Sequence, residues 1–160
     1  MSARTAPTTA RSTAPTRHRA LALLTVVLLA VTTTACLPKE EQSFLDRTNS
    51  LRASQGIRPL QEHGVLTQKA ESWAQYMAST HALAHSTLSS GLSRLAWKSL
   101  GENVGWASGG KDPYLQIHNG FASSSGHRAN LLNPKFTHMG IGVAVAGDGS
   151  VWVAEVFAQL

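Results

Sequence analysis

The chain has 160 residues and a formal net charge of +5, but the positive charge is concentrated near its start. Four of the fourteen basic residues lie within positions 4–19, and no acidic residue precedes Glu40. From Cys36 onward, ten Lys and Arg residues stand against nine Asp and Glu residues, which leaves a net charge of +1. A nucleic-acid-binding face requires clustered Lys and Arg, so we expect no nucleic-acid partner.

The N-terminal segment has the layout of an export signal. A basic leader without acids precedes the apolar run ALALLTVVLLAV at residues 20–31. This run falls within the ~7–15 residues of a signal-peptide core and is short of the ~20 residues of a membrane-spanning helix. We therefore assign residues 1–35 to a signal peptide and expect the remainder to work outside the cytoplasm.

Cys36 is the only cysteine of the chain and directly follows the small residue Ala35. No intrachain disulfide can form, so the domain must rely on packing. Small residues followed by a lone cysteine resemble a bacterial lipobox, in which the cysteine carries a thioether-linked diacylglycerol; Thr33 departs from the aliphatic residue usual there. The resemblance predicts a lipoprotein held by Cys36 on the outer face of the cell membrane. The alternative is an ordinary signal peptide cut near Ala35, and free secretion.

The mature chain has room for one domain. Residues 36–42 are short and polar and are expected to be a tether, and residues 43–160 to be the domain, a common domain length of ~100–150 residues. Ser43 is expected to cap the first helix, and Gly56 and Pro59 to end it. Apolar residues recur at helical spacing in this helix and in a second one: Phe44, Leu45, Thr48 and Leu51, then Leu66, Ala70, Trp73, Ala74 and Met77.

The period of the pattern changes toward the C-terminus. Asp112 is expected to cap a third helix, and a short fourth helix is expected over residues 128–132. Residues 139–146 and 150–158 then alternate as strands around a Gly-Asp-Gly hairpin turn. Apolar side chains occur on both faces of both strands, so both faces must be covered. The predicted fold is therefore an α-β-α sandwich with a small antiparallel sheet.

Four short segments carry side chains suited to chemistry: HALAH at 81–85, GEN at 101–103, GHRANLLNP at 126–134 and FTHMGIG at 136–142. Together with GENVGWA and the final WVAEVFA, they resemble the CAP superfamily, or SCP domain, in its disulfide-free bacterial branch. The superfamily includes cysteine-rich secretory proteins, antigen 5 proteins and plant pathogenesis-related proteins. The resemblance covers about residues 43–160 and implies an α-β-α sandwich with three antiparallel core strands, one of them near residues 102–106.

The resemblance also implies a site. Family members carry two His and two acidic residues in a cleft, which binds a divalent metal in some members. The matching positions are His85, Glu102 and His127, whereas the second acid position falls on Ser124, with Phe121 in the place of a Trp. Two imidazoles and one carboxylate suit Zn²⁺ with an open coordination position, which would acidify a bound water. The alternatives are a metal-free cleft that orients a polar ligand, or residues that only tie loops together.

Other histidines are expected to serve structure. His81 lies four positions before His85, so on a helix the two would share a face, but we place His81 at an exposed position or at the rim of the cleft. His63, His118 and His138 lack a partner pattern and are expected to be surface or cap residues.

Five further residues near these motifs have predicted settings. Arg128 and Asn130 are expected to form a salt bridge or a helix-end cap. A buried Glu needs a partner, so we expect Glu155 at the edge of the sheet. Trp97 and Trp106 bracket the GEN motif and are expected to pack in the core, although they would also suit the wall of a ligand groove.

Three functions are compatible with this pattern. The first is a binding module for a lipid-like molecule or a cell-envelope component, since the resemblance includes eukaryotic members that bind sterols and fatty acids. The second is a metal-assisted, peptidase-like hydrolase, and the third is a structural or signalling surface protein. The missing acid at Ser124 and the lack of a G-x-S-x-G motif weigh against catalysis. We therefore predict binding rather than an enzyme.

Overall fold

The computed structural model describes residue 1 and residues 38–160, so Cys36 and most of the predicted signal peptide lie outside the described residues. Its elements in chain order are α1 (Lys39–Ser54), β1 (Gln61–Glu62), α2 (Gly64–Thr80), β2 (Ser99–Ala107), α3 (Pro113–Ser123), α4 (Ser125–Leu131), β3 (His138–Val145) and β4 (Val151–Gln159). The strands form one sheet in the order β1-β3-β4-β2. Strand β1 is parallel to β3, and the other neighbours are antiparallel.

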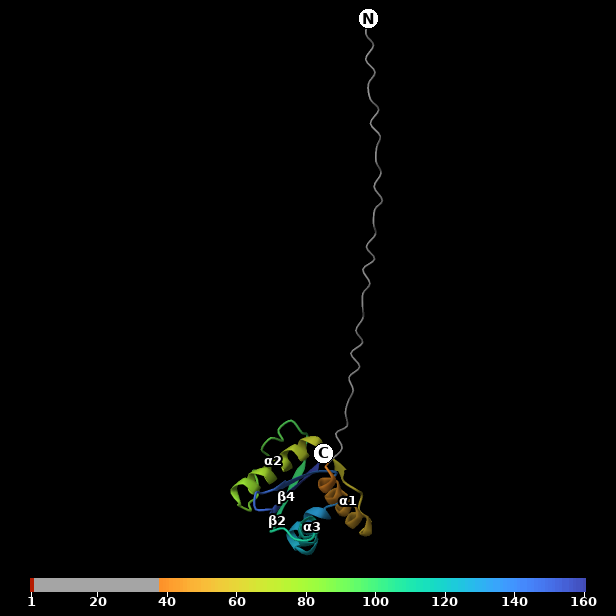
Figure 1. Ribbon diagram of the computed structural model, residues 1–160. Helices are drawn as coiled ribbons and strands as arrows, with labels where there is room; N and C mark the ends of the chain where they lie inside the picture. The colour runs from red at the N-terminus through yellow and green to blue at the C-terminus, as the bar shows by residue number, and fades with distance from the viewer. Residues whose placement is uncertain (2–37) are drawn as a thin grey trace. The chain divides into compact units, whose positions relative to one another are not determined.

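Helices cover both faces of this sheet (Figure 1). Helix α2 packs on one face, where Leu66 and Met77 join a core cluster with Trp152 and Val156 of β4. Helices α1, α3 and α4 pack on the other face; their buried residues include Phe44, Ile117, Phe121 and Leu131. The predicted α-β-α sandwich is confirmed. No helix in the described part of the chain is long and apolar enough to cross a membrane.

Two boundaries differ from the prediction at the start of the domain. Helix α1 begins at Lys39, not after Ser43, so half of the predicted tether is helical. Pro38 occupies the N-cap position, and Glu40 and Glu41 in the first turn interact favourably with the positive end of the helix dipole. The sheet also has a fourth strand, the two-residue β1, which is too short to give a periodic sequence pattern.

The C-terminal half lies close to the prediction. Asp112 caps α3, because its side chain accepts a hydrogen bond from the Leu115 amide at 2.9 Å. Helix α4 begins at Ser125, three residues before the expected start. The β3–β4 hairpin closes through the Ala146 amide, which donates to the Ser150 carbonyl at 2.8 Å.

Arg52 joins α1 to the segment that carries the family motifs. Its side chain is fully buried, and its guanidinium donates to backbone carbonyls of four residues. These are Arg58, Leu131, Asn133 and Phe136, at 2.8 to 3.3 Å. A charged donor that satisfies several buried carbonyls forms strong hydrogen bonds, so Arg52 fixes the end of α4 and the entry to β3.

Helix α2 lies in direct contact with β3 at two glycines of the MGIG motif. A Cβ atom on Gly140 would overlap the backbone of Leu66 and Thr67, and one on Gly142 would overlap the backbone of Ala70 and Glu71. The two sites are one helical turn apart on α2. Side chains at these positions would separate the helix from the sheet, so only glycine permits this spacing.

We expect Gly140→Ala to lower the free energy of unfolding by roughly 3 kcal/mol or more, because overpacking forces backbone shifts. Gly147→Ala is the matched control, since a Cβ atom there meets nothing within 4 Å. It should change stability by no more than about 0.5 kcal/mol. Urea unfolding followed by circular dichroism measures both. Equal stability of the two variants would contradict the direct helix–sheet contact.

Candidate functional site

Glu102 on β2 is the centre of the polar site. Its carboxylate is buried, and both of its oxygens accept hydrogen bonds from the segment that follows α2. The Oε1 atom lies 2.8 Å from Nδ1 of His85 and accepts from the Ser86 amide at 2.8 Å. The Oε2 atom accepts from the Ser86 hydroxyl at 2.6 Å. The predicted His85–Glu102 pair is therefore formed, with His85 on the solvent side and 61% exposed.

Helix α2 holds the same segment from the other side. The Lys69 ammonium donates to the Thr87 carbonyl at 3.0 Å, and the Trp73 indole donates to the Ala84 carbonyl at 2.8 Å. Burial lowers the pKa of Lys69, and the Glu102 carboxylate counteracts that shift. Sequence reasoning missed Ser86 and Lys69. Ser86 directly follows His85, which is a usable signal, whereas nothing in the sequence marks Lys69.

The other two residues of the GEN motif join β2 to α4. A Cβ atom on Gly101 would lie 2.8 Å from the ring of Phe136, so this strand and the Phe136 side chain are in close contact. The Asn103 amide donates to the His127 carbonyl at 3.3 Å and accepts from Asn130 at 2.9 Å. Asn130 also donates to the Glu102 carbonyl at 3.0 Å. These bonds fix the positions of Glu102 and His127 relative to each other.

Arg128 has the predicted role of a helix-end cap, whereas Asn130 forms neither a cap nor a salt bridge. Arg128 donates to the Ala122 carbonyl at 3.1 Å and so caps the C-terminal end of α3. Asn130 instead links α4 to the sheet.

Glu155 is not at the edge of the sheet, which corrects the prediction. It lies on β4, an interior strand, and is completely buried. Its Oε2 atom accepts from the Asn103 amide at 3.0 Å, and its Oε1 atom has no partner in residues 38–160. Burial raises the pKa of Glu155 to about 8, although the Asn103 hydrogen bond opposes the shift. The neutral carboxyl is therefore the main form at neutral pH.

A groove of about 450 Å³ runs along β2 between this strand and α3. Its walls are mostly apolar and include Leu83, Val104, Trp106, Ile117 and Phe121. Gln116, Ser124 and His127 supply its polar groups. The volume lies within the roughly 300–1,000 Å³ of small-molecule sites, which are typically apolar with few polar groups.

His127 and Ser124 therefore line the groove, whereas His85 and Glu102 lie outside its lining. His127 packs on Phe121 with ring centroids 5.0 Å apart. Burial lowers the pKa of His127, and the nearby His85 lowers it further. The neutral imidazole, which both donates and accepts a hydrogen bond, is thus favoured in the groove wall.

The exposed tryptophans correct the expectation of core packing. Trp106 is 49% exposed and stacks on the buried Trp152, with ring centroids 5.6 Å apart. Trp97 is 37% exposed and does not line the groove. Trp106 lines the groove, which was the alternative setting considered for it.

The histidines outside the site agree with their predicted settings at His81 and His63 and differ at His118. Helix α2 ends at Thr80, and His81 adopts the left-handed conformation with a φ of 52°, so His81 and His85 do not share a helical face. His81 is exposed, and its Nε2 atom lies 3.3 Å from a carboxylate oxygen of Asp148. His118 is buried against Phe44 and is not a surface residue. His63, as expected of a cap residue, accepts from the Val65 amide at the start of α2.

A zinc site needs three or more ligands that converge on one point. In residues 38–160 no group of three or more His, Cys, Asp and Glu side chains could hold one metal ion. Glu102 already uses both oxygens to accept hydrogen bonds from His85 and Ser86. This arrangement does not fit a three-ligand zinc site at His85, Glu102 and His127, so we derive no metal-dependent step.

The fold and the GEN and GHR segments define a class of α-β-α sandwich domain, and comparison with known proteins identifies it. The family model described as "CAP: Cysteine-rich secretory protein family" matches residues 45–157. The chain therefore belongs to the CAP family.

Relatives of known sequence or structure agree with this assignment. The "Uncharacterized protein YkwD" of Bacillus subtilis is 31% identical over 126 residues, which are 74% of this chain and 47% of that protein. The present chain thus spans about half of that relative. The human "Golgi-associated plant pathogenesis-related protein 1" is 34% identical over 118 residues, 66% of this chain and 73% of that protein. A crystal structure of an extracellular SCP-domain protein from Bacillus anthracis shares the fold, with a TM-score of 0.64, 24% identity, and coverage of 76% of this chain and 40% of that one.

The buried Glu155 predicts a pH-dependent stability. The pKa of Glu155 is raised from 4.5 to about 8 in the folded state. Its contribution to the free energy of unfolding is therefore fully present below pH 4.5 and is lost as the pH rises through 8. Glu155→Gln mimics the neutral acid and should be more stable than the wild type near pH 9, by on the order of 5 kcal/mol, with similar stability near pH 5. Urea unfolding across this range measures the difference.

Glu41 is a second source of pH-dependent stability. Burial and the nearby Glu71 raise the pKa of Glu41 to about 7. The contribution of Glu41 to stability therefore also falls as the pH rises, equally in the wild type and in Glu155→Gln. The difference between wild type and Glu155→Gln isolates Glu155. Parallel pH profiles of the two proteins would show that Glu155 is ionised in the folded state.

Proposed function

We propose that this chain is an exported, lipid-anchored CAP-domain protein whose groove along β2 and α3 binds a lipid-like molecule. The groove is the observation that carries the proposal. Its apolar wall suits an acyl or similar chain, and His127, Ser124 and Gln116 suit a polar head group that accepts or donates hydrogen bonds. Leu83 and Trp106, each 49% exposed, leave apolar surface at the groove that such a ligand would cover.

Three observations support export and anchoring. The basic leader and apolar run at the N-terminus have the order and length of a signal peptide. The Bacillus anthracis protein that shares the fold is described as extracellular. The only cysteine stands directly after this segment, where a lipid anchor would be attached.

A hydrolytic function has less support. Glu102 is the only acid of the site, and both of its oxygens are occupied by hydrogen bonds that hold the His85–Ser86 segment. A general base needs a free position within hydrogen-bond reach of the substrate. The bonds of Glu102 indicate that it positions a loop, so we assign no catalytic residue.

Fatty-acid titration tests the groove. We expect the mature domain to bind cis-parinaric acid, with an increase in probe fluorescence. Trp106→Ala should weaken this binding by about tenfold or more, because truncating a large aromatic in a binding site commonly costs over 1 kcal/mol. Trp97→Ala is the matched control, since Trp97 is also partly exposed but lies outside the groove.

Two results would contradict the binding proposal. Equal dissociation constants for the two tryptophan variants would place the probe elsewhere. Failure of the wild type to bind this probe, together with no lipid retained in native mass spectrometry of the protein taken from its membranes, would favour an envelope component or a structural surface role.

Metabolic labelling with radioactive palmitate tests the anchor. The full chain should incorporate label in a bacterial host, and Cys36→Ser should not, because the thioether requires the thiol. Globomycin, which inhibits the lipoprotein signal peptidase, should cause the unprocessed form to accumulate. An unlabelled wild-type protein in the medium would instead indicate cleavage near Ala35 and free secretion.

A further inference from the structure

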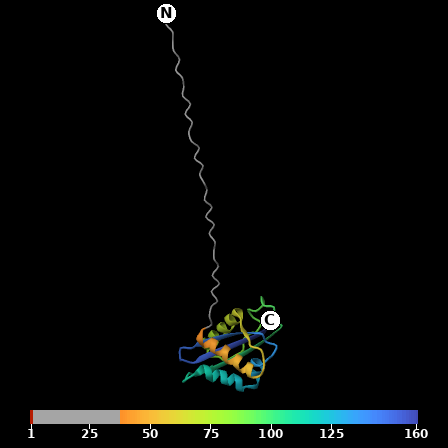
Figure 2. The ribbon, with the colours of Figure 1, turned by 90° about the vertical axis from the view of Figure 1, so that its right-hand side faces the viewer.

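Several chain segments meet at one end of the domain, which we call the hairpin end. It comprises the turn of the β3–β4 hairpin at residues 146–150, the end of β2, the loop at residues 108–112, the start of α1 and residues 81–83. Figure 2 shows the start of α1 and the hairpin at the same end, away from the C-terminus. The Glu41 carboxylate accepts from the Val143 amide at 3.3 Å, which joins α1 to this end.

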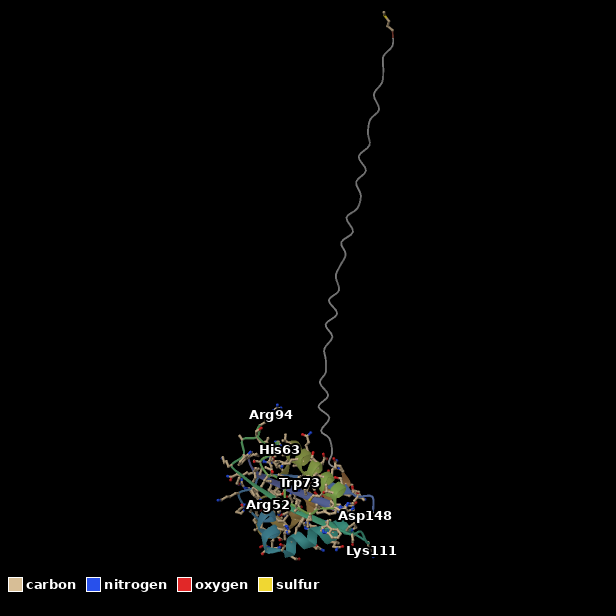
Figure 3. The ribbon with its side chains drawn as sticks, turned by 90° about the vertical axis from the view of Figure 1, so that its left-hand side faces the viewer. Arg52, His63, Trp73, Arg94, Lys111 and Asp148 are labelled. Atoms are coloured by element: carbon tan, nitrogen blue, oxygen red, sulfur yellow. The ribbon has the colours of Figure 1, made fainter. Side chains whose placement is uncertain are left out.

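Two further contacts close the hairpin end. His81, just past α2, lies 3.3 Å from Asp148 in the hairpin turn. The loop after β2 touches the same turn, because a Cβ atom on Gly109 would lie 3.4 Å from the Gly149 carbonyl. Lys111 and Asp148 lie near each other at this end in Figure 3, away from Arg52 and His63.

The hairpin end exposes large apolar side chains. Val145 at the end of β3 is 60% exposed, and Leu83 and Trp106 are each 49% exposed. Trp106 directly precedes Ala107 on β2. Ala107 pairs with Val151 on β4, and Val151 pairs in turn with Val145 on β3. Leu83 and Trp106 line the same groove. We call these three residues the apolar rim: Leu83 and Trp106 line the groove, and Val145 lies two strands from Trp106 at the same end of the sheet.

Charges around the apolar rim are nearly balanced. Lys39 at the start of α1 and Lys111 in the loop after β2 are the basic residues, and Glu40 beside Lys39, Asp112 and Asp148 are the acidic ones. No single sign of charge dominates, so the surface neither requires a highly charged partner nor repels an anionic one.

The sequence places the proposed anchor beside this end. Cys36 is three residues before Lys39, where α1 begins. Three residues span at most about 11 Å when fully extended. A lipid on Cys36 would therefore bring the membrane to the start of α1, and so to the apolar rim.

We propose that the hairpin end rests on the lipid bilayer, with Val145, Trp106 and Leu83 in the interfacial layer. This inference rests on the lipid anchor proposed above, and its partner is the membrane surface. Tryptophan and apolar side chains favour the membrane–water interface, and the short link to Cys36 leaves little room for a protein in between. The groove then opens toward the bilayer at Trp106, and its polar lining at His127 lies farther from the lipid. A lipid-like ligand could enter from the membrane without crossing water.

Brominated lipids test this orientation, because bromine quenches tryptophan fluorescence only at short range. The mature chain from Cys36 is coupled through its single thiol to a maleimide phospholipid in vesicles of brominated phosphatidylcholine and phosphatidylglycerol. We expect strong quenching in the wild type. Trp106→Phe, which keeps an aromatic ring on Trp152, should lose most of the quenching. Trp97→Phe should keep it, because Trp97 lies near the start of β2, which pairs with the C-terminal end of β4.

A variant of the rim separates insertion from mere proximity. Val145→Asp alters a largely exposed side chain, so it should leave thermal unfolding unchanged while it reduces quenching of Trp106. Any one of four results would overturn the proposal. These are no quenching in the wild type, retained quenching in Trp106→Phe, loss of quenching in Trp97→Phe, and undiminished quenching in Val145→Asp. The coupling chemistry supplies the anchor here, so these results do not depend on whether a cell lipidates Cys36. Failure of palmitate labelling would refute only the anchor.

Discussion

Helix α2 lies directly on strand β3, because Gly140 and Gly142 have no side chains to hold its backbone away. This contact sets the height of the helix above the sheet, and with it the path of the segment that follows the helix. Lys69 on α2 can then bond the Thr87 carbonyl while Glu102 on β2 bonds Ser86. The site is thus assembled between helix α2 and strand β2, and the two glycines of β3 set the height of α2 above the sheet that contains β2.

On the other face of the sheet, buried polar groups fix the opposite side of the site. Asn103 connects the neutral Glu155 in the interior of the sheet with Asn130 and with the backbone of His127. Unpaired buried polar groups are costly, so this network tolerates little change in the position of α4. His127 consequently lines the apolar groove in a defined place. These two sets of constraints fix the α2 side and the α4 side of the site.

The sequence alone was sufficient for the architecture and for part of the site. Helical and strand periodicity located α2 and the β3–β4 hairpin, because these elements each bury a regular pattern of side chains. The family resemblance pointed to Glu102 and His127 together, and the structure connects them through Asn103 and Asn130, although only His127 lines the groove. Glu155 and Trp106 were misplaced because their burial depends on which strand is interior and on what covers it. Strand β1 pairs for only two residues, and so short a pairing leaves no periodic signal.

The central claim is that the groove holds an amphipathic molecule with its polar head at His127 and its apolar chain toward Trp106. Nuclear magnetic resonance with spin-labelled stearic acids tests it most directly, because a nitroxide broadens only nearby signals. With the label near the carboxylate, the His127 imidazole signals should broaden most. With the label near the methyl end, the Trp106 indole signal should broaden most, and that of Trp97 should stay sharp in both cases. The same broadening for both label positions, or broadening centred on Trp97, would contradict the account.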